Sequence, residues 1–443
     1  MYKKLFGLWM MLGILTWTQG VWAQSSSTEL RLRALEQKLA AKEEENKTQM
    51  RVFYNKGLKM ETADKKFKLQ IGGRIMTDFA FFNENDTFKA SSAEGDQKSG
   101  AEFRRARIFL AGLLYNRIGF KAQYEFAGGS PKFKNVYIQL VKLPWVGNFR
   151  VGNYKEPWSL ENLTSSKYIT FMERSLPNAF SRSQILGMGF FNHALDQRLT
   201  WTVGLFYDTD QDSPISNFDN HPGEWNGGFR ITGLPWYPNK GRQLVHLGFS
   251  YIHEDQGKNG SFTVESRPEA HLTSFNPVGV NLATDAMEKI NRYNFEAAAV
   301  YGRFSLQFEY MLLNGDAPVG TPGVHYTGWY IHASYFITGE HRKYKTKSGT
   351  FARVSPRQNF EDGGWGAWQV ALRYSTLDLN DDNSAAAYLG GEMDNITVGL
   401  NWHLNPNTRF MFNYVHSMVD SAAVPSASAG NLNIFQARFQ IDF

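Results

Sequence analysis

The chain contains no cysteine among its 443 residues, so neither disulfides nor thiol-bound metals can stabilise it. Long apolar runs are also missing after residue 23, and the mean hydropathy is −0.41. A helix needs about 20 apolar residues to cross a bilayer, so a protein with several membrane-spanning helices is excluded. The sequence has no HExxH, no GxSxG and no Gly-rich phosphate loop followed by Lys, so it carries none of these enzyme motifs.

The one long apolar run lies at the N-terminus, where residues 1–23 have the order of a secretory signal peptide. Lys3 and Lys4 precede the stretch LFGLWMMLGIL, and the segment closes on Val21, Trp22 and Ala23. This pattern predicts export and cleavage after Ala23. Residues 24–65 are then expected to form a periplasmic helical stub or linker. Leu32, Leu35 and Leu39 have a coiled-coil-like spacing that ends within two turns, which leaves both a coiled-coil stub and a solvated linker open.

Beyond that segment the hydrophobic period is two, as the last residues, NIFQARFQIDF, show. Phe435, Phe439 and Phe443 fall on one side of an extended strand, whereas Arg438 and Asp442 fall on the other. The stretches RIGFKAQYEF, RFSLQFEYML and WQVALRYS alternate in the same way. Strands of about ten residues with one apolar and one charged face are typical of membrane-spanning β-barrels, which have lipid outside and water inside.

The pattern predicts an all-β fold, a closed antiparallel transmembrane barrel of sixteen strands within residues 66–443. Sixteen is an even number and would place both termini on the periplasmic side. The expected strands are 67–82, 102–115, 117–127, 133–143, 148–155, 187–194, 198–208, 225–237, 243–254, 290–301, 303–313, 326–337, 365–377, 392–404, 408–419 and 432–443.

The predicted connections alternate between short turns and long polar loops, as outer-membrane barrels require. This parity places the strand-like residues 262–272 inside a long outer loop, at 254–289. It also places residues 339–363 on the periplasmic side, although they are too many for a plain turn. We therefore expect that segment to fold back into the lumen.

Seven cations fall on the predicted inner face of the strands, where a wide, water-filled barrel would not require buried partners for them. Rings of Arg and Lys are typical of the wall of an anion pore. Asp78, Glu125 and Glu309 also face inward, so lumen charges of both signs that merely keep the pore wet remain an alternative. The predicted inward cations are Arg74, Arg105, Arg107, Lys121, Arg230, Arg373 and Arg438.

Several segments resemble the phosphate-selective porin O/P family of outer-membrane proteins. They are FYNKGLKMETADKKFKLQIGGRI, EFRRARIFLAG, GNYKEPWSLENLTSSKYITFMERSLPNAF and the closing strand, and the resemblance extends over 53–443. The resemblance implies a homotrimeric porin whose third outer loop, 156–186, folds inward to form the constriction. It also implies that the outer loop 254–289 and the segment 339–363 narrow the lumen.

The family's anion site, carried over by the resemblance, corresponds to Arg74, Arg104, Arg105, Ser165, Ser166 and Arg174. Two positions depart from the phosphate-specific pattern, since Asn162 stands in place of a lysine and Asn135 in place of an aspartate. Loss of a cation and an acceptor is expected to weaken anion selectivity.

These observations predict a passive outer-membrane channel that favours small inorganic anions, phosphate among the candidates. It would lie among outer-membrane lipid and lipopolysaccharide, and would use no cofactor, no metal and no nucleic acid. One alternative is an outer-membrane barrel enzyme of the lipase or protease type, because His246, His253 and Ser250 share one strand. Another is a surface adhesin that uses the loop from Glu254. The acidic run of Asp208, Asp210 and Asp212 is expected to be a solvated outer loop, since a calcium loop would need Gly at its sixth position.

Overall fold

The structure, a computed structural model, describes residues 29–42, 44, 47, 49–55, 57–91, 97–182, 184–207, 225–256, 262–282, 287–381, 383, 388–420 and 430–443. The signal peptide predicted for residues 1–23 lies outside the described residues. So do Asp208, Asp210 and Asp212.

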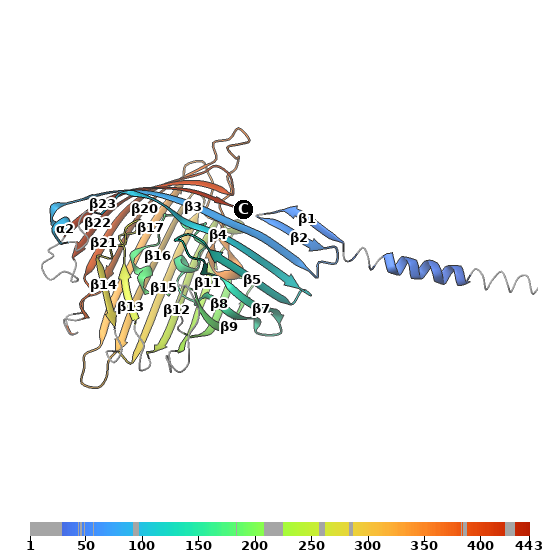
Figure 1. Cartoon of the computed structure of the whole chain (residues 1–443), viewed down its shortest axis with the longest axis horizontal. Helices are drawn as coiled ribbons and strands as arrows, with labels where there is room; N and C mark the ends of the chain where they lie inside the picture. Colours follow the sequence, from blue (N-terminus) through green and yellow to red (C-terminus); the bar gives the residue numbers. More distant parts are fainter. Residues whose placement is uncertain are drawn as a thin grey trace, which may run out of the picture.

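Sixteen antiparallel strands form a closed barrel, because the last strand, β23, pairs with the first, β3 (Figure 1). The prediction of a sixteen-stranded barrel is confirmed. The barrel strands are β3 (Lys68–Glu84), β4 (Gly100–Leu114), β5 (Ile118–Glu125), β7 (Val136–Leu143), β8 (Gly147–Lys155), β9 (Gln184–Ala194), β10 (Leu199–Tyr207), β11 (Trp225–Trp236), β12 (Gln243–Asp255), β15 (Lys289–Tyr301), β16 (Phe304–Asp316), β17 (Val324–Phe336), β20 (Ala367–Asp378), β21 (Glu392–His403), β22 (Thr408–Asp420) and β23 (Gly430–Asp442).

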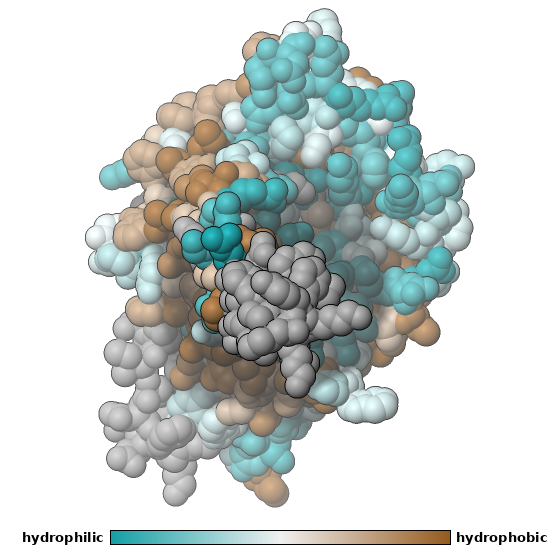
Figure 2. Space-filling model, turned by 90° about the vertical axis from the view of Figure 1, so that its right-hand side faces the viewer, coloured by the Kyte–Doolittle hydropathy of each residue, from teal (hydrophilic) through white to brown (hydrophobic). Residues whose placement is uncertain are grey.

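The alternation of each strand separates an apolar outer face from a polar inner face. In β23, Phe435 and Phe439 are 57% and 45% exposed, whereas Arg438 is fully buried. This arrangement is the reverse of that in a soluble protein, and it fits hydrocarbon around the barrel. Figure 2, which views the molecule from the side of the N-terminal helix, shows hydrophobic residues covering one flank and hydrophilic residues gathered on the opposite side.

The outer end of the wall carries a belt of aromatic side chains at strand positions that pair with one another. Tyr251 pairs with Tyr293, and Tyr310 pairs with Trp329. Such belts lie at the membrane–water boundary, where an amphipathic ring has both lipid and water within reach. These aligned aromatic rings therefore mark the outer edge of the bilayer on the barrel wall.

The N-terminal segment adds a hairpin that the residue pattern does not predict. Residues 29–42 form an exposed helix that projects away from the barrel (Figure 1). After it, β1 (Met50–Tyr54) pairs with β2 (Leu58–Thr62), and β2 extends the sheet beside β3. Each strand has five residues, too few for a two-residue period to stand out. No helix in the described part of the chain is long and apolar enough to span a membrane.

Three segments fold inward and occupy part of the lumen. The inner loop, residues 156–182, contains α3 (Leu160–Leu163) and the 3-10 helix η1 (Leu176–Phe180). The crossing loop, described at 256, 262–282 and 287–288, contains β13 (Phe262–Ser266) and β14 (Val278–Leu282), which pair in a sheet of their own. The inner turn, 337–366, contains β18 (Tyr344–Lys345), η3 (Thr346–Ser348) and β19 (Thr350–Phe351). The assignment of 262–272 to a loop and the inward fold of 339–363 are both confirmed.

Apolar contacts hold these segments against the wall. Leu160 of the inner loop and Phe351 of the inner turn share one buried cluster with Leu244 and Val300 of the wall. At Gly349 a Cβ would lie 2.6 Å from Thr232 Oγ1, so only glycine allows this approach of the inner turn to the wall. Smaller elements complete the described chain: α2 (Asp86–Ser91), β6 (Lys132–Phe133) and η2 (Asn239–Gly241).

Candidate functional site

A β-bulge at the start of β4 turns two consecutive arginines into the lumen. Met76 pairs with Arg105, whereas Thr77 pairs with Phe103, so Arg104 is the extra residue. In a regular strand Arg104 and Arg105 would point to opposite faces, but a bulge re-aims one of them. Strand alternation alone would place only Arg105 inward, and no pattern along the chain indicates the bulge.

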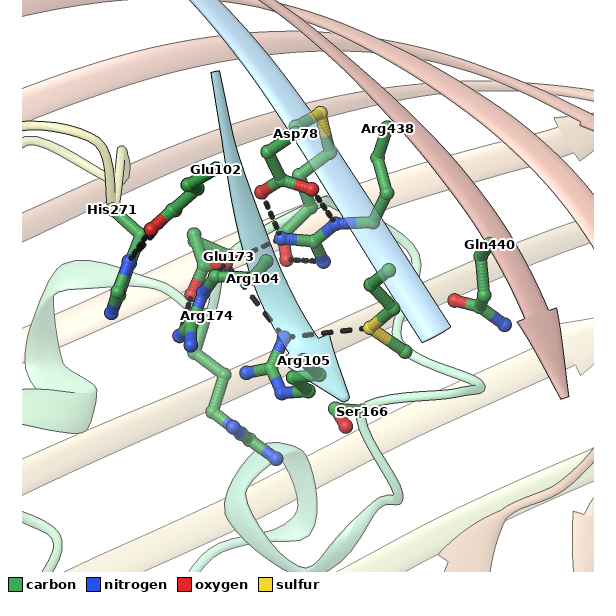
Figure 3. Close-up of polar contacts among 12 residues, drawn as sticks. Asp78, Glu102, Arg104, Arg105, Ser166, Glu173, Arg174, His271, Arg438 and Gln440 are labelled. Carbon is green, nitrogen blue, oxygen red and sulfur yellow. Dashed lines mark hydrogen bonds and ion pairs between the residues drawn. The ribbon is translucent and has the colours of Figure 1, made fainter. Parts of the chain in front are cut away.

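The Glu173 side chain of the inner loop lies among arginines of β4 and β23 (Figure 3). Its carboxylate accepts two hydrogen bonds from Arg104, at 2.8 and 2.9 Å, and one from Arg438 Nη2 at 2.6 Å. Arg438 also binds Asp78 through two bonds, while Arg105 Nη1 lies 4.0 Å from Glu173. Burial alone would raise the pKa of the Glu173 carboxyl, but Arg104 and Arg438 outweigh it and hold the pKa well below its usual range.

Further inward cations are neutralised in the same way. Arg292 Nη1 lies 2.7 Å from Glu156 of the inner loop, and Arg230 Nη2 lies 2.6 Å from Glu296. Arg373 binds Glu161 of the inner loop and Glu269 of the crossing loop, and Arg107 binds Glu125. The expectation that lumen cations need no buried partners is therefore wrong for Arg107, Arg230, Arg373 and Arg438. The reason is that inward-folded segments exclude water there, and a buried charge then requires a counter-charge.

The inner loop is also fixed through its backbone. Glu309 on β16 accepts hydrogen bonds from the backbone N–H groups of Leu160 and Glu161, at 2.9 and 2.8 Å. The Tyr330 hydroxyl donates to the same carboxylate at 2.5 Å. Together with Glu156, Glu161 and Glu173, this contact ties the loop to the wall formed by β15, β16, β20 and β23.

A second group of inward cations, on β3, β5 and β8, has no carboxylate partner among the described residues. Arg74 Nη1 donates to Ser166 Oγ of the inner loop at 2.6 Å. Lys121 Nζ lies over the Phe109 ring, 5.1 Å from its centre, and Arg150 donates to the Gln139 side chain at 3.1 Å. The strongest charges acting on Lys121 belong to Arg74, Lys167, Arg150 and Arg107, all of them cations. This side of the lumen is therefore electropositive.

Lys155, at the end of β8, belongs to the same group, although it is not among the site residues predicted from the sequence. Its ammonium donates to Asn162 Oδ1 at 2.8 Å and to the Asn162 carbonyl. The charges acting on it come from Arg174, Arg107, Arg105 and Arg74. Lys155 thus brings a cation to Asn162, the position at which the sequence lacks one. Strand alternation could not have identified it, because Lys155 has the same parity as Val151, which faces outward.

The remaining residues expected at the site have other contacts. Arg174 donates to the carbonyl oxygens of Glu161, Asn162 and Thr164 at 3.1–3.2 Å, so it braces the inner loop from within. Ser165 Oγ accepts a long bond from the Lys167 N–H at 3.4 Å. Asn135 donates to Gln123 Oε1 at 3.0 Å, a neutral pairing.

The histidine–serine group considered for an enzyme does not form a catalytic pair. His246 and Ser250 are both fully buried, and both bind Glu296 instead of each other. His253 binds Asn291. A serine nucleophile needs a base within hydrogen-bond reach and access to a substrate, and this arrangement provides neither.

Comparisons with known proteins agree with this architecture. The model of the family "Phosphate-selective porin O and P" matches residues 69–443. Porin O of Pseudomonas aeruginosa is 25% identical over 397 residues, covering 82% of this chain and 86% of that protein. An uncharacterised protein of Caulobacter vibrioides is 30% identical over 356 residues, covering 78% and 68%.

Solved structures share the fold at low identity. The anion-selective porin from Comamonas acidovorans aligns with a TM-score of 0.52 at 14% identity, covering 85% of this chain and all of that one. The outer-membrane channel DcaP of Acinetobacter baumannii aligns with a TM-score of 0.53 at 11% identity, covering 86% and 99%. From the family match and the closed barrel with its inward-folded loops, the chain is a member of the phosphate-selective porin O and P family and is an outer-membrane porin.

Proposed function

We propose that the barrel is a passive channel that favours small anions, with phosphate among its candidate solutes, and that it carries out no covalent chemistry. One observation carries the proposal: the lumen charges are segregated. The inward arginines Arg104, Arg107, Arg230, Arg292, Arg373 and Arg438 are paired with carboxylates. Arg74, Lys121, Arg150 and Lys155 have no carboxylate partner among the described residues.

Unneutralised cations attract anions into the pore and repel cations. A unit charge at 4 Å contributes between about 1 and 4 kcal/mol, depending on whether the surroundings resemble water or the protein surface. Neutral partners such as Ser166 and Asn162 keep these groups oriented without cancelling their charge. Binding then stays weak enough for release, as conduction requires.

The names of the relatives support anions as the solute class, since one is an anion-selective porin and the family is described as phosphate-selective. Asn162 and Asn135 remain departures from the phosphate-specific pattern. Lys155 restores a cation beside Asn162, but nothing comparable restores a carboxylate at Asn135. We therefore propose general anion preference, with phosphate as one permeant or blocking ion.

Reversal potentials of single channels in asymmetric KCl test this proposal. The wild type is expected to be anion-selective, and Lys121→Gln with Lys155→Gln should reduce the anion-over-cation permeability ratio several-fold. Lys289→Gln, at the exposed outer end of β15, is the matched control because it removes the same charge away from the electropositive side. Cation selectivity in the wild type, or equal ratios in all three proteins, would refute the proposal.

We also propose that the porin is a homotrimer. Strands β5 and β7 have eight residues each, fewer than the 9–11 that a tilted strand needs to cross a bilayer. Their outward side chains are nevertheless apolar, and Ile138 is 62% exposed. Contact with further copies of the chain would cover the part of the wall formed by the short strands β5 and β7. The exposed helix at residues 29–42 is a second candidate for contact between copies.

A further inference from the structure

A small cavity lies behind the inner loop, at the end of the barrel that carries the short turns. It is lined by Lys167, Tyr168 and Thr170 of the inner loop and by 352–354 of the inner turn. The ends of β20–β23 and the turn Asn405–Asn407 close its other sides. Its volume is about 20 Å³, enough for one water-sized occupant. We call it the turn-side cavity.

The charges around the turn-side cavity are predominantly positive. Lys167, Arg342, Arg353 and Arg409 line it, against a single carboxylate, Asp442. Asp442 already accepts from Lys167, at 3.1 Å, and from Arg353. Burial lowers the pKa of Arg342 to about 10, so this guanidinium is still charged at neutral pH. The lining therefore has a clear excess of positive charge.

Several polar atoms of the lining have no hydrogen-bond partner within the described structure. They are the Nε atoms of Arg353 and Arg409, Nε2 of His403 and Oγ1 of Thr170. Each of these side chains is more than nine-tenths buried. A buried polar group without a partner costs about 1–3 kcal/mol. The Nε–H groups of both arginines and the Thr170 hydroxyl can donate, and so can His403 Nε2 in its Nε2–H tautomer, so these groups around one cavity indicate an occupant that accepts hydrogen bonds.

The two arginines are held in place by their other nitrogens. Arg409 Nη1 donates to the Ile169 carbonyl at 2.8 Å, and its Nη2 donates to Gln440 at 3.0 Å. Arg353 donates to the Pro406 carbonyl and to Asp442. The guanidinium groups are thus fixed, and their Nε–H groups remain available to a bound group.

We propose that the turn-side cavity binds one monatomic anion of the halide class, held by Arg353, Arg409 and His403. The volume of about 20 Å³ suits a single monatomic ion, and the excess positive charge favours an anion over water. Such an ion would join the inner loop to the inner turn, because it would take hydrogen bonds from Thr170 and Arg353 together. This site is separate from the selectivity proposed for Lys121 and Lys155.

Bromide replaces chloride and scatters anomalously, so crystals of the full chain grown in sodium bromide test the proposal. A peak is expected in the turn-side cavity of the wild type and of Lys121→Gln, and it should disappear in Arg409→Gln. His403→Leu should lower its occupancy, and it serves as the second variant if Arg409→Gln does not fold. Water alone in the wild-type cavity, or an unchanged peak in Arg409→Gln, would overturn the proposal. Selectivity is tested by Lys121→Gln with Lys155→Gln, and the cavity by Arg409→Gln and His403→Leu, so the two proposals fail independently.

Discussion

At the scale of the residue, the partner of a cation decides its role. Arg104 and Lys155 both face the lumen, and both lie near the inner loop. Arg104 is neutralised by the Glu173 carboxylate, whereas the hydrogen bonds of Lys155 within the described residues go to the neutral Asn162. An inward arginine is therefore not by itself an anion ligand. Whether an inward lysine or arginine can attract an anion depends on whether a carboxylate already neutralises it.

Glu173 gives a prediction for acid pH. Its pKa is held well below the ordinary 4.5, with Arg104 and Arg438 outweighing burial. A carboxylate with a lowered folded-state pKa contributes stability that is fully present above the unfolded-state pKa and is lost as the pH falls through the folded-state pKa. The melting temperature should therefore be steady from pH 5 to 8 and fall below about pH 4.5.

In Glu173→Gln that acid-dependent fall should be smaller, and the melting temperature at pH 7 should be lower than in the wild type. Thermal unfolding of the detergent-solubilised barrel between pH 3 and 8 provides the measurement. Other lumen carboxylates titrate in both proteins, so the difference between the two curves isolates Glu173. Parallel curves would contradict the role given to this carboxylate.

At the scale of the element, strand parity predicted where the inner turn belongs, and close packing explains how it stays there. Gly349 has a φ of 58°, and its carbonyl accepts a hydrogen bond from Arg230 Nη2 at 2.8 Å. The turn thus reaches β11 at a residue whose backbone conformation and lack of a side chain are both required.

Gly349→Ala is expected to displace the inner turn from the wall and raise single-channel conductance. The added Cβ would meet Thr232 Oγ1 at 2.6 Å and Arg230 Nη1 at 3.1 Å, in a backbone region that alanine disfavours. Gly363→Ala is the matched control, since Gly363 lies in the same turn with a φ of 77° and has open space around it. Equal conductance of the two variants would show that the turn does not narrow the pore.

At the scale of the whole molecule, the barrel strands differ in length, and the short strands give a prediction about assembly. Ile138→Asn, on the eight-residue strand β7, should weaken the trimer, because a polar group would enter the proposed interface. Leu372→Asn, on the twelve-residue β20, should leave the trimer intact because it faces lipid. Light scattering of the solubilised porins measures the mass of each, and a trimeric Ile138→Asn with unchanged heat stability would place the interface elsewhere.

Much of the architecture was predictable, because alternation is a local property of the chain. The closed sheet of sixteen strands, the loop position of 262–272 and the inward fold of 339–363 all followed from period and parity. The hairpin β1–β2, the bulge that turns Arg104 inward and the contact of Lys155 with Asn162 did not follow. The bulge depends on pairing between strands, and the Lys155 contact depends on how the inner loop folds back beside the end of β8. The hairpin strands are too short to show a period.

The sequence by itself determined the barrel, since each strand's alternation assigns one face to hydrocarbon and the other to water whatever its neighbours are. The tertiary structure alone decided which lumen charges remain unneutralised. Arg438 and Asp78 lie 360 positions apart, and Arg373 and Glu269 lie 104 apart, so only closure of the barrel and the inward folding of its loops bring them together. Charge neutralisation depends on distance in space, and no pattern along the chain records it.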